Sequence, residues 1–322
     1  MLHVRLVVPD YLTKQVMEIL SGSPEVINLW HIPGAVAKPE GDLVSCDVAK
    51  EDASPILQEL RNLGLEQYGS IAVENVDASI SRAARVAEQV ADGQPADAVV
   101  WEEVTGRVAD SATLSISYLV LIIIATMIAA IGLLTDSILM VIGAMVVGPE
   151  FGPLAGVCVA LVEGRHQLAA RSFRALAVGF PLGIAMAALL VLGLRVTGIA
   201  PESYLPAEHQ LTHLASDPNS YVVIVALLAG VVGMLALVGE KSGVLVGVLV
   251  SVTTIPAAAY VAVSATYAFW GETGMALITL AINLTSIILS GVLVLWLVRQ
   301  ARSRRVARRR REKQTESEEP AP

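Results

Sequence analysis

The chain has few of the residues that cross-link a fold or carry out covalent chemistry. Its 322 residues include two cysteines, Cys46 and Cys158, and aromatic residues make up 5%. One cysteine falls in a polar region and the other in an apolar segment, which excludes a disulfide framework. The sequence shows no phosphate-binding glycine loop, no Walker pattern and no cluster with metal-ligand spacing. His3 and His31 are isolated, and each is read as a polar residue on the exposed face of a strand. We therefore expect no catalytic residues, no cofactor and no enzyme activity.

Apolar sequence, in contrast, is abundant. Hydrophobic residues make up 54% of the chain and the mean hydropathy is +0.64, with the apolar residues concentrated after about residue 112. Six segments reach or approach the roughly 20 residues that cross a bilayer. Their bounds are 113–134, 137–163, 167–196, 220–239, 242–270 and 273–298. We expect the lipid bilayer to be the main partner and the first span to serve as the insertion signal.

Lysine and arginine collect on one side of this topology. The loops 135–136, 197–219 and 271–272 contain neither residue, and Arg195 departs from the pattern. The positive charges lie in the alternate loops and after the last span, at Arg165, Arg171, Arg174, Lys241 and from Arg299 to Arg311. The positive-inside rule then places both termini in the cytoplasm.

The net charge of −8 conceals an uneven distribution. Residues 1–110 carry 8 basic and 18 acidic groups, whereas the tail at 300–322 is first basic and then acidic. We interpret Arg302–Arg311 as a topology determinant that binds anionic lipid headgroups. The basic block has no interleaved aromatic residues and adjoins a membrane span, which argues against nucleic acid as a partner.

The first 78 residues alternate between strand and helix patterns. The predicted order is strand, helix, strand, strand, helix, strand, which is the ferredoxin-like α+β plan (βαββαβ). We predict a cytoplasmic domain over 1–78 that forms oligomers or senses a small ligand. Residues 79–112 are predicted as a helical connector, partly amphipathic. That connector either lies along the inner leaflet or acts as a lever between the soluble domain and the spans.

The apolar part of the sequence consists of two similar repeats. Residues 113–196 and 220–299 each contain an apolar helix, an apolar segment interrupted by proline, and a further apolar helix, with the loop 197–219 between them. Three spans per repeat is an odd number, so the second copy enters the membrane from the opposite side. We predict a membrane all-α bundle of six spans, a 3+3 inverted repeat with broken second helices. Such paired breaks typically mark a transport site near the bilayer midplane.

The two predicted breaks supply the candidate site. Backbone groups freed by proline are costly in lipid unless protein, water or an ion satisfies them. Glu150, in the first break, is a candidate cation ligand, proton carrier or cap of the second half-helix. Hydroxyls and carbonyls at the second break suit a monovalent cation or polar solute, or serve local backbone repair. The candidate residues are Gly148, Pro149, Glu150, Gly152 and Pro153, then Ser251, Thr253, Thr254 and Pro256, with Asn283 on the last span.

Two motifs resemble a known family. Ile142-Gly143-Ala144-Met145 runs into Gly148-Pro149 and Gly152-Pro153, and the segment 247–256 ends in Thr253-Thr254-Ile255-Pro256. Together with the N-terminal domain, this order resembles the DUF389 family of bacterial and archaeal membrane proteins. The resemblance implies a prokaryotic inner-membrane protein of two parts, and it brings no substrate and no functional residues.

Two functions remain open from the sequence. One is a transporter or ion-conducting protein with its site where the breaks meet, regulated by the cytoplasmic domain. The other is a membrane-anchored sensor or scaffold whose soluble domain binds a ligand or partner and whose bundle does not transport. Glycines spaced four apart around 148–156 and 243–251 allow close helix contact, and we expect a homo-oligomer.

Overall fold

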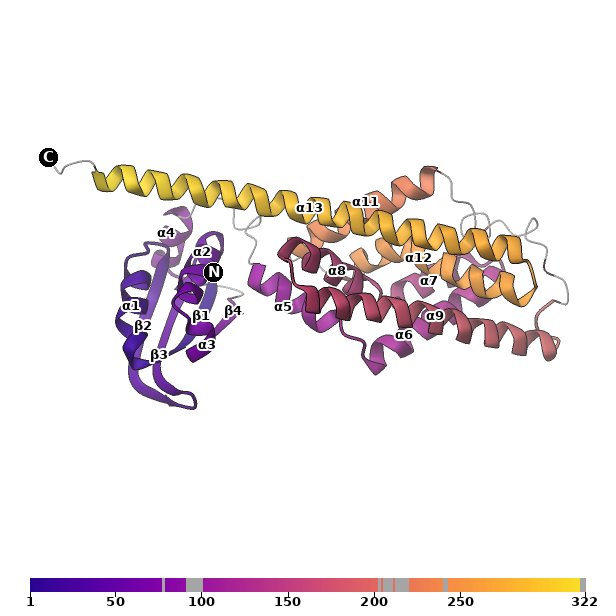
Figure 1. Ribbon diagram of the computed structural model, residues 1–322, viewed down its shortest axis with the longest axis horizontal. Helices are drawn as coiled ribbons and strands as arrows, with labels where there is room; N and C mark the ends of the chain where they lie inside the picture. The colour runs from indigo at the N-terminus through magenta and orange to yellow at the C-terminus, as the bar shows by residue number, and fades with distance from the viewer. Residues whose placement is uncertain are drawn as a thin grey trace. The chain divides into compact units, whose positions relative to one another are not determined.

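A computed structural model describes residues 1–76, 79–90, 101–201, 204, 211, 220–239 and 243–318. The side chains at 88, 90, 102–103, 243–253 and 302–318 are outside that description. The chain divides into two compact units, an N-terminal unit at Met1–Val104 and a helical unit at Thr105–Pro322. Figure 1 shows a small sheet with helices in the first and long helices in the second.

The N-terminal unit contains a four-stranded antiparallel sheet, as the alternating strand patterns predict. The strand order is β2-β3-β1-β4, with Leu2 of β1 opposite Val48 of β3 and Asn75 of β4. Its elements are β1 (Leu2–Val8), α1 (Asp10–Ser21), β2 (Val26–Ala37), β3 (Glu40–Val48), α2 (Lys50–Asn62), α3 (Leu65–Tyr68) and β4 (Ser70–Asn75). Alternate residues of β1 and β3 pack against the apolar stripes of α1 and α2 to form the core.

Helix α2 begins earlier than its sequence pattern indicates. Ser54-Pro55 reads as a cap followed by the first helical residue, yet the helix starts at Lys50 and Pro55 lies inside it. Ala53 is 1% exposed and belongs to the core that joins α2 to the sheet. Burial of this turn accounts for a helix that continues through a residue without an N–H donor.

The helical unit consists mainly of apolar helices. It contains α6 (Ile116–Leu134), α7 (Ile138–Val147), α8 (Phe151–Glu163), α9 (His166–Val196), α11 (Ser220–Val238), α12 (Gly243–Thr266) and α13 (Trp270–Glu318). Among the described residues, 4 helices are long and apolar enough to cross a membrane, or 5 if the bent pair α7 and α8 forms one span. The two helices of this pair meet at an angle of 50°. The chain is therefore a helical membrane protein with a small antiparallel sheet at its N-terminus.

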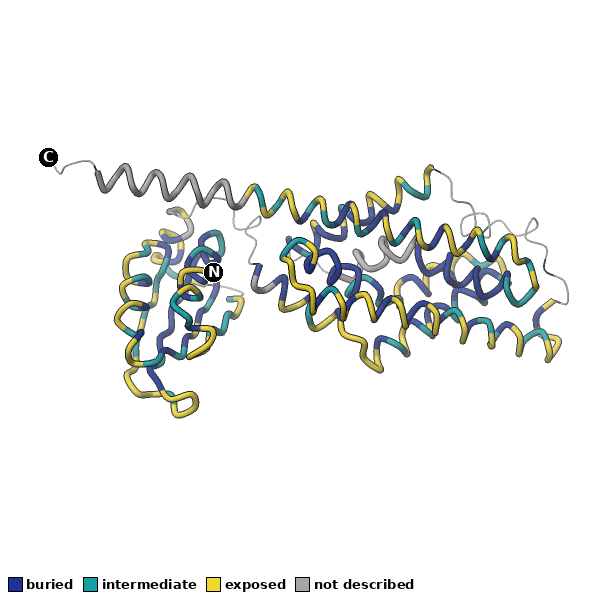
Figure 2. The backbone as a smooth tube through the Cα atoms, in the orientation of Figure 1, coloured by how far each residue is buried: buried dark blue, intermediate teal, exposed yellow. Residues whose placement is uncertain are grey.

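Helix α12 is the central helix of this unit. Every residue from Thr254 to Ser264 is buried, and this part of α12 is dark blue in Figure 2. The helices that contact it most are α6, α7, α9, α11 and α13. A helix that is apolar all round is expected at such a position.

One predicted feature of the second repeat is wrong. Helix α12 runs without interruption from Gly243 to Thr266 with Pro256 inside it, so the second predicted break is absent from the described backbone. A proline in a membrane helix removes one donor, and neighbouring helices can satisfy the freed carbonyl without a break. The apolar part of helix α13, Trp270–Ala301, covers the last predicted span, and the helix itself continues to Glu318.

The connector before the spans contains two helices. Helix α4 covers Arg82–Val90 and helix α5 covers Trp101–Ser111. Trp101, Val104, Thr105 and Val108 are buried and lie on one face of α5, whereas Gly106, Arg107 and Asp110 are exposed on the other. A helix resting on the leaflet surface would turn its apolar face to lipid, but the residues of this face are buried by protein.

Candidate functional site

The break between α7 and α8 has a simple cause in the sequence. Gly148 ends α7 in an extended conformation with ψ of 123°, and its N–H donates to the Ala144 carbonyl. Pro149 has no N–H to offer the Met145 carbonyl, so the ladder stops there. Pro153 is the third residue of α8, where an N–H would have no intrahelical partner in any case. Pro149 therefore accounts for the break, and Pro153 fits within the first turn of the next helix.

Glu150 lies in this break and is fully buried. Its side chain is 0% exposed, as is Thr254 of α12, and the Thr254 hydroxyl donates to Glu150 Oε1 at 2.9 Å. Glu150 belongs to the first half of the membrane sequence and Thr254 to the second. The structure thus brings together one candidate residue from each predicted repeat.

Apolar side chains surround this pair. Phe151 and Leu154 of α8 pack in one cluster with Tyr118 and Ile122 of α6, Ala257 and Ala258 of α12, and Leu280 and Ile287 of α13. A carboxylate in such surroundings loses its hydration, so its charge is costly unless a hydrogen bond or cation compensates it. The hydroxyl of Thr254 supplies one such hydrogen bond.

Sequence reasoning did not identify Tyr118. Its phenol is buried and interacts electrostatically with Glu150. A Cβ atom on Gly179 of α9 would lie 2.6 Å from the Tyr118 hydroxyl oxygen, so only glycine leaves room for this ring. The available signal was a single aromatic residue in the otherwise aliphatic helix Ile116–Leu134.

The other candidate residues have different positions. Asn283 is 1% exposed on the face of α13 that also carries Leu280 and Ile287 of the same cluster. Pro256 lies two residues after Thr254 within α12. The side chains of Ser251 and Thr253 lie outside the described residues. In the described part of the chain, no group of three or more His, Cys, Asp or Glu residues could hold a metal ion.

Both histidines of the sheet have aspartate partners, contrary to the reading of isolated residues. His3 Nδ1 lies 2.7 Å from Asp47 Oδ1, and His3 Nε2 lies 2.9 Å from Ser45 Oγ. This is the hydrogen-bond order of a serine–histidine–aspartate triad. However, Ser45 is 1% exposed and donates to the Val4 carbonyl. The buried serine instead joins β3 to β1, and strand register brings the three side chains together.

The second pair lies at the other end of β3. Asp42 accepts hydrogen bonds from the Gly34 N–H at 2.8 Å and the Thr13 hydroxyl at 2.7 Å, and His31 Nε2 lies 2.8 Å away. The hydrogen bonds from Gly34, then Thr13 and His31, hold the pKa of Asp42 below its usual value. This carboxylate fastens the β2–β3 hairpin to α1.

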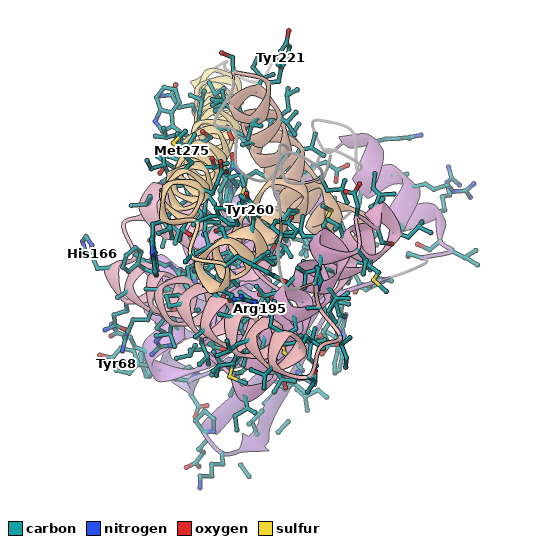
Figure 3. The ribbon with its side chains drawn as sticks, turned by 90° about the vertical axis from the view of Figure 1, so that its right-hand side faces the viewer. Tyr68, His166, Arg195, Tyr221, Tyr260 and Met275 are labelled. Atoms are coloured by element: carbon teal, nitrogen blue, oxygen red, sulfur yellow. The ribbon has the colours of Figure 1, made fainter. Side chains whose placement is uncertain are left out.

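Arg195, which departs from the charge rule, has a structural role at the end of α9. Its guanidinium donates to the Thr266 carbonyl at 2.5 Å and lies 4.3 Å from the ring centroid of Tyr267. A cation at the last carbonyls of α12 is favourable for that helix end. In Figure 3, Arg195 and Tyr260 lie among the helices, whereas His166 and Tyr221 point away from them.

The candidate site lies in a part of the chain that matches a family model. The model of DUF389, a domain of unknown function, matches residues 145–289, which include Glu150, Thr254 and Asn283. This match confirms the resemblance over that range. An uncharacterised protein of Methanocaldococcus jannaschii is 23% identical over 246 residues, covering 76% of this chain and 72% of that protein. No solved structure matches the chain.

Proposed function

We propose that this protein moves or conducts a small monovalent cation or a proton across the prokaryotic inner membrane, with Glu150 as the binding group. One observation supports this most directly. A carboxylate that is 0% exposed lies in the break of a bent helix pair and accepts a hydrogen bond from the other half of the membrane sequence. An ionisable residue within the membrane is costly to keep and typically marks an ion or proton pathway.

The chemistry of the break favours a hard cation. Helix α7 ends at Val147, so its last carbonyls direct partial negative charge toward the break. The Glu150 carboxylate and the Thr254 hydroxyl add further oxygen atoms. Oxygen ligands suit a sodium-like ion or a proton and do not suit a soft metal. Binding of either would neutralise the buried carboxylate and offset the cost of its desolvation.

The proposed architecture has six spans in a 3+3 inverted arrangement, with both termini in the cytoplasm. The helices α6 to α9 and α11 to α13 support the count, and the charge pattern of the loops supports the orientation. Among the described helices the bend occurs in the pair α7 and α8, whereas α12 continues through Pro256. The hydrogen bond from Thr254 to Glu150 does not depend on a second break.

The N-terminal unit is proposed to be a ferredoxin-like cytoplasmic domain that regulates the site or forms homo-oligomers. The strand order β2-β3-β1-β4 with two helices between the strands supports this plan. We further propose that Arg302–Arg311, whose side chains lie outside the described residues, bind anionic lipid headgroups. Nucleic acid and enzymatic chemistry have no part in the proposal.

Thermal unfolding of the purified full chain tests the proposal. Ligands that bind only the folded state raise the melting temperature with concentration. We expect Na⁺, another monovalent cation or protons to raise the melting temperature of the wild type but not of Glu150→Gln. Glu272→Gln is the matched control, because the Glu272 carboxylate also accepts a hydrogen bond, from the Tyr260 hydroxyl at 3.2 Å. This variant should keep the rise in melting temperature.

Flux assays in liposomes then follow with the ion that gave the response. We expect Glu150→Gln to abolish flux and Glu272→Gln to retain it. A wild type and Glu150→Gln that respond identically to every ion and to pH would refute the site. A response to a metabolite alone would instead favour the sensor function.

A further inference from the structure

We propose that α5 controls the ion site by positioning α8, the half-helix that begins directly after Glu150. This inference concerns the regulation of the proposed ion site and rests on that function. Helix α5 and the residue after it contact α8 near both ends of α8, at Glu163 and at Gly152.

The first contact is a hydrogen bond at the far end of α8. The Thr105 hydroxyl donates to Glu163 Oε1 at 3.1 Å, and Glu163 is the last residue of α8. Residues after Thr105 on the same face of α5 are also buried. Val108 is 2% exposed, and Ala112, which directly follows the helix, is 0% exposed.

The second contact lies near Glu150 and depends on two glycines. A Cβ atom on Gly152 would lie 2.6 Å from the Ser111 carbonyl oxygen and 2.9 Å from Ser111 Cβ. A Cβ atom on Gly156 would lie 2.2 Å from Ser172 Oγ of α9 and 2.7 Å from Ala112 Cβ. A side chain on Gly152 would push α5 and α8 apart, whereas one on Gly156 would meet α9 as well. These glycines, predicted to allow close helix contact, therefore leave the space that the end of α5 occupies.

These contacts show that α5 and α8 run antiparallel to each other. Thr105 of α5 meets the end of α8, whereas Ser111 and Ala112 meet its beginning. The 13 residues of α8 form a rigid rod of about 20 Å, since a helix rises about 1.5 Å per residue. A displacement of Ser111 is therefore transmitted to the first turn of α8 and to Glu150 before it.

The cytoplasmic end of α8 is also anchored elsewhere. Arg299 of α13 donates to the Val162 carbonyl, and Arg165 lies 2.8 Å from Glu163. These cations stabilise the negative end of the α8 dipole. The opposite end of α8 has mainly apolar neighbours. A shift of Ser111 would thus swing the Glu150 end of α8 about its anchored end.

Helix α5 is also the segment that joins the two units. It begins at Trp101, inside the N-terminal unit Met1–Val104, and ends at Ser111 in the helical unit. Any change of the N-terminal unit that moves or reorders α5 therefore has a direct path to α8. This is the lever interpretation of the connector, now with the residues that would carry it.

Hydrogen exchange of the full chain tests the coupling, because linked sites must affect each other reciprocally. The probe is the ion, Na⁺ or protons, that raises the melting temperature of the wild type. We expect this ion to slow amide exchange in α5 as well as in the first turn of α8. Glu150→Gln should remove both effects.

Three variants isolate the contact. Gly152→Ala forces α5 away from α8, and we expect about tenfold faster exchange in residues 105–111 and loss of the ion effect there. Thr105→Val removes the hydrogen bond with little steric change and should give the same result in weaker form, with Thr105→Ser restoring it. Gly143→Ala is the matched control, because a Cβ atom there meets nothing within 4 Å.

The outcomes separate the two proposals. An ion that raises the melting temperature but leaves α5 exchange unchanged would overturn the lever while the ion site stands. Absence of any ion response would overturn the ion site. In that case, equal α8 exchange in Gly152→Ala and Gly143→Ala would also overturn the contact between α5 and α8, and faster exchange in Gly152→Ala alone would support it.

Discussion

The hydroxyl of Thr254 donates a 2.9 Å hydrogen bond to the carboxylate of Glu150 across 104 residues of sequence. Both residues are fully buried, one at the break between α7 and α8 and the other in the central helix α12. This contact joins the two halves of the membrane sequence at the candidate site.

Replacement of Thr254 should therefore destabilise the helical unit. Thr254→Val keeps the shape and removes the donor, which should cost about 2 kcal/mol because a buried carboxyl oxygen loses a hydrogen-bond donor. Thr254→Ser should restore most of that loss. The free energy of unfolding, measured in mixed detergent, checks both.

Thr266→Val is the matched control for that experiment. The Thr266 hydroxyl donates at 2.8 Å to the Ala262 carbonyl of its own helix and is half-buried. Its replacement should cost less than half as much. If Thr254→Val and Thr266→Val lowered the free energy of unfolding equally, the hydrogen bond to Glu150 would not contribute more than an ordinary side-chain hydrogen bond.

The close approach of α11 and α13 depends on Gly230. A Cβ atom there would lie 2.6 Å from the Ile287 carbonyl oxygen and 2.1 Å from Ser290 Oγ. The carbonyl belongs to backbone and cannot move aside, so Gly230→Ala should destabilise the protein by about 1–3 kcal/mol. Gly143→Ala, in open space, should be neutral or stabilising by up to about 1 kcal/mol. Thermal unfolding of the two variants distinguishes overpacking from a general effect of alanine.

Asp42 should make the N-terminal unit sensitive to acid. Hydrogen bonds lower its pKa in the folded state below the ordinary value of 3.8. Its contribution to stability is therefore complete above that ordinary pKa and is lost as the pH falls through the lower folded-state pKa. Asp42→Asn should remove this part of the acid dependence and cost about 2 kcal/mol at neutral pH.

Amide exchange in β3 as a function of pH measures that effect. Glu40→Gln changes an exposed carboxylate at the start of the same strand and should leave the exchange nearly unchanged. If Asp42→Asn and Glu40→Gln gave the same acid profile, the hydrogen-bonded carboxylate would not be the cause.

Cys46 should be unreactive in the folded protein. Burial, and secondarily the charge of Asp47, raises the pKa of its thiol to about 12. At pH 8 only about one thiol in ten thousand would be the reactive thiolate. In a Cys158→Ser background, we expect no labelling by a maleimide until denaturant is added. Adding Tyr11→Cys, at a position 68% exposed, should give immediate labelling and serves as the positive control.

Much of the fold could be predicted from the sequence. Apolar length alone gave spans that agree with α6, α9 and α11 to within a few residues, because a bilayer sets the length of a helix that crosses it. Alternation in residues 2–8 predicted β1, since one face of the sheet is buried. Pro149 predicted the bend between α7 and α8 because it removes a donor from the helix.

Other features depended on tertiary contacts. Pro256 lies in an intact helix because neighbouring helices enclose α12 on all sides, and sequence patterns do not report such neighbours. His3 and His31 gained aspartate partners through strand register, which joins residues distant in the chain. Tyr118 entered the site because Gly179 of another helix leaves space for it.

The sequence by itself determined that this is a helical membrane protein with a small sheet domain, and it placed an acidic residue at a break in a span. Only the tertiary structure decided that Glu150 faces Thr254 and that α5 packs on the glycines of α8. The physical reason is that the spans are apolar on all sides. Without an amphipathic period, composition fixes the length of a helix but not which of its faces meets its neighbours.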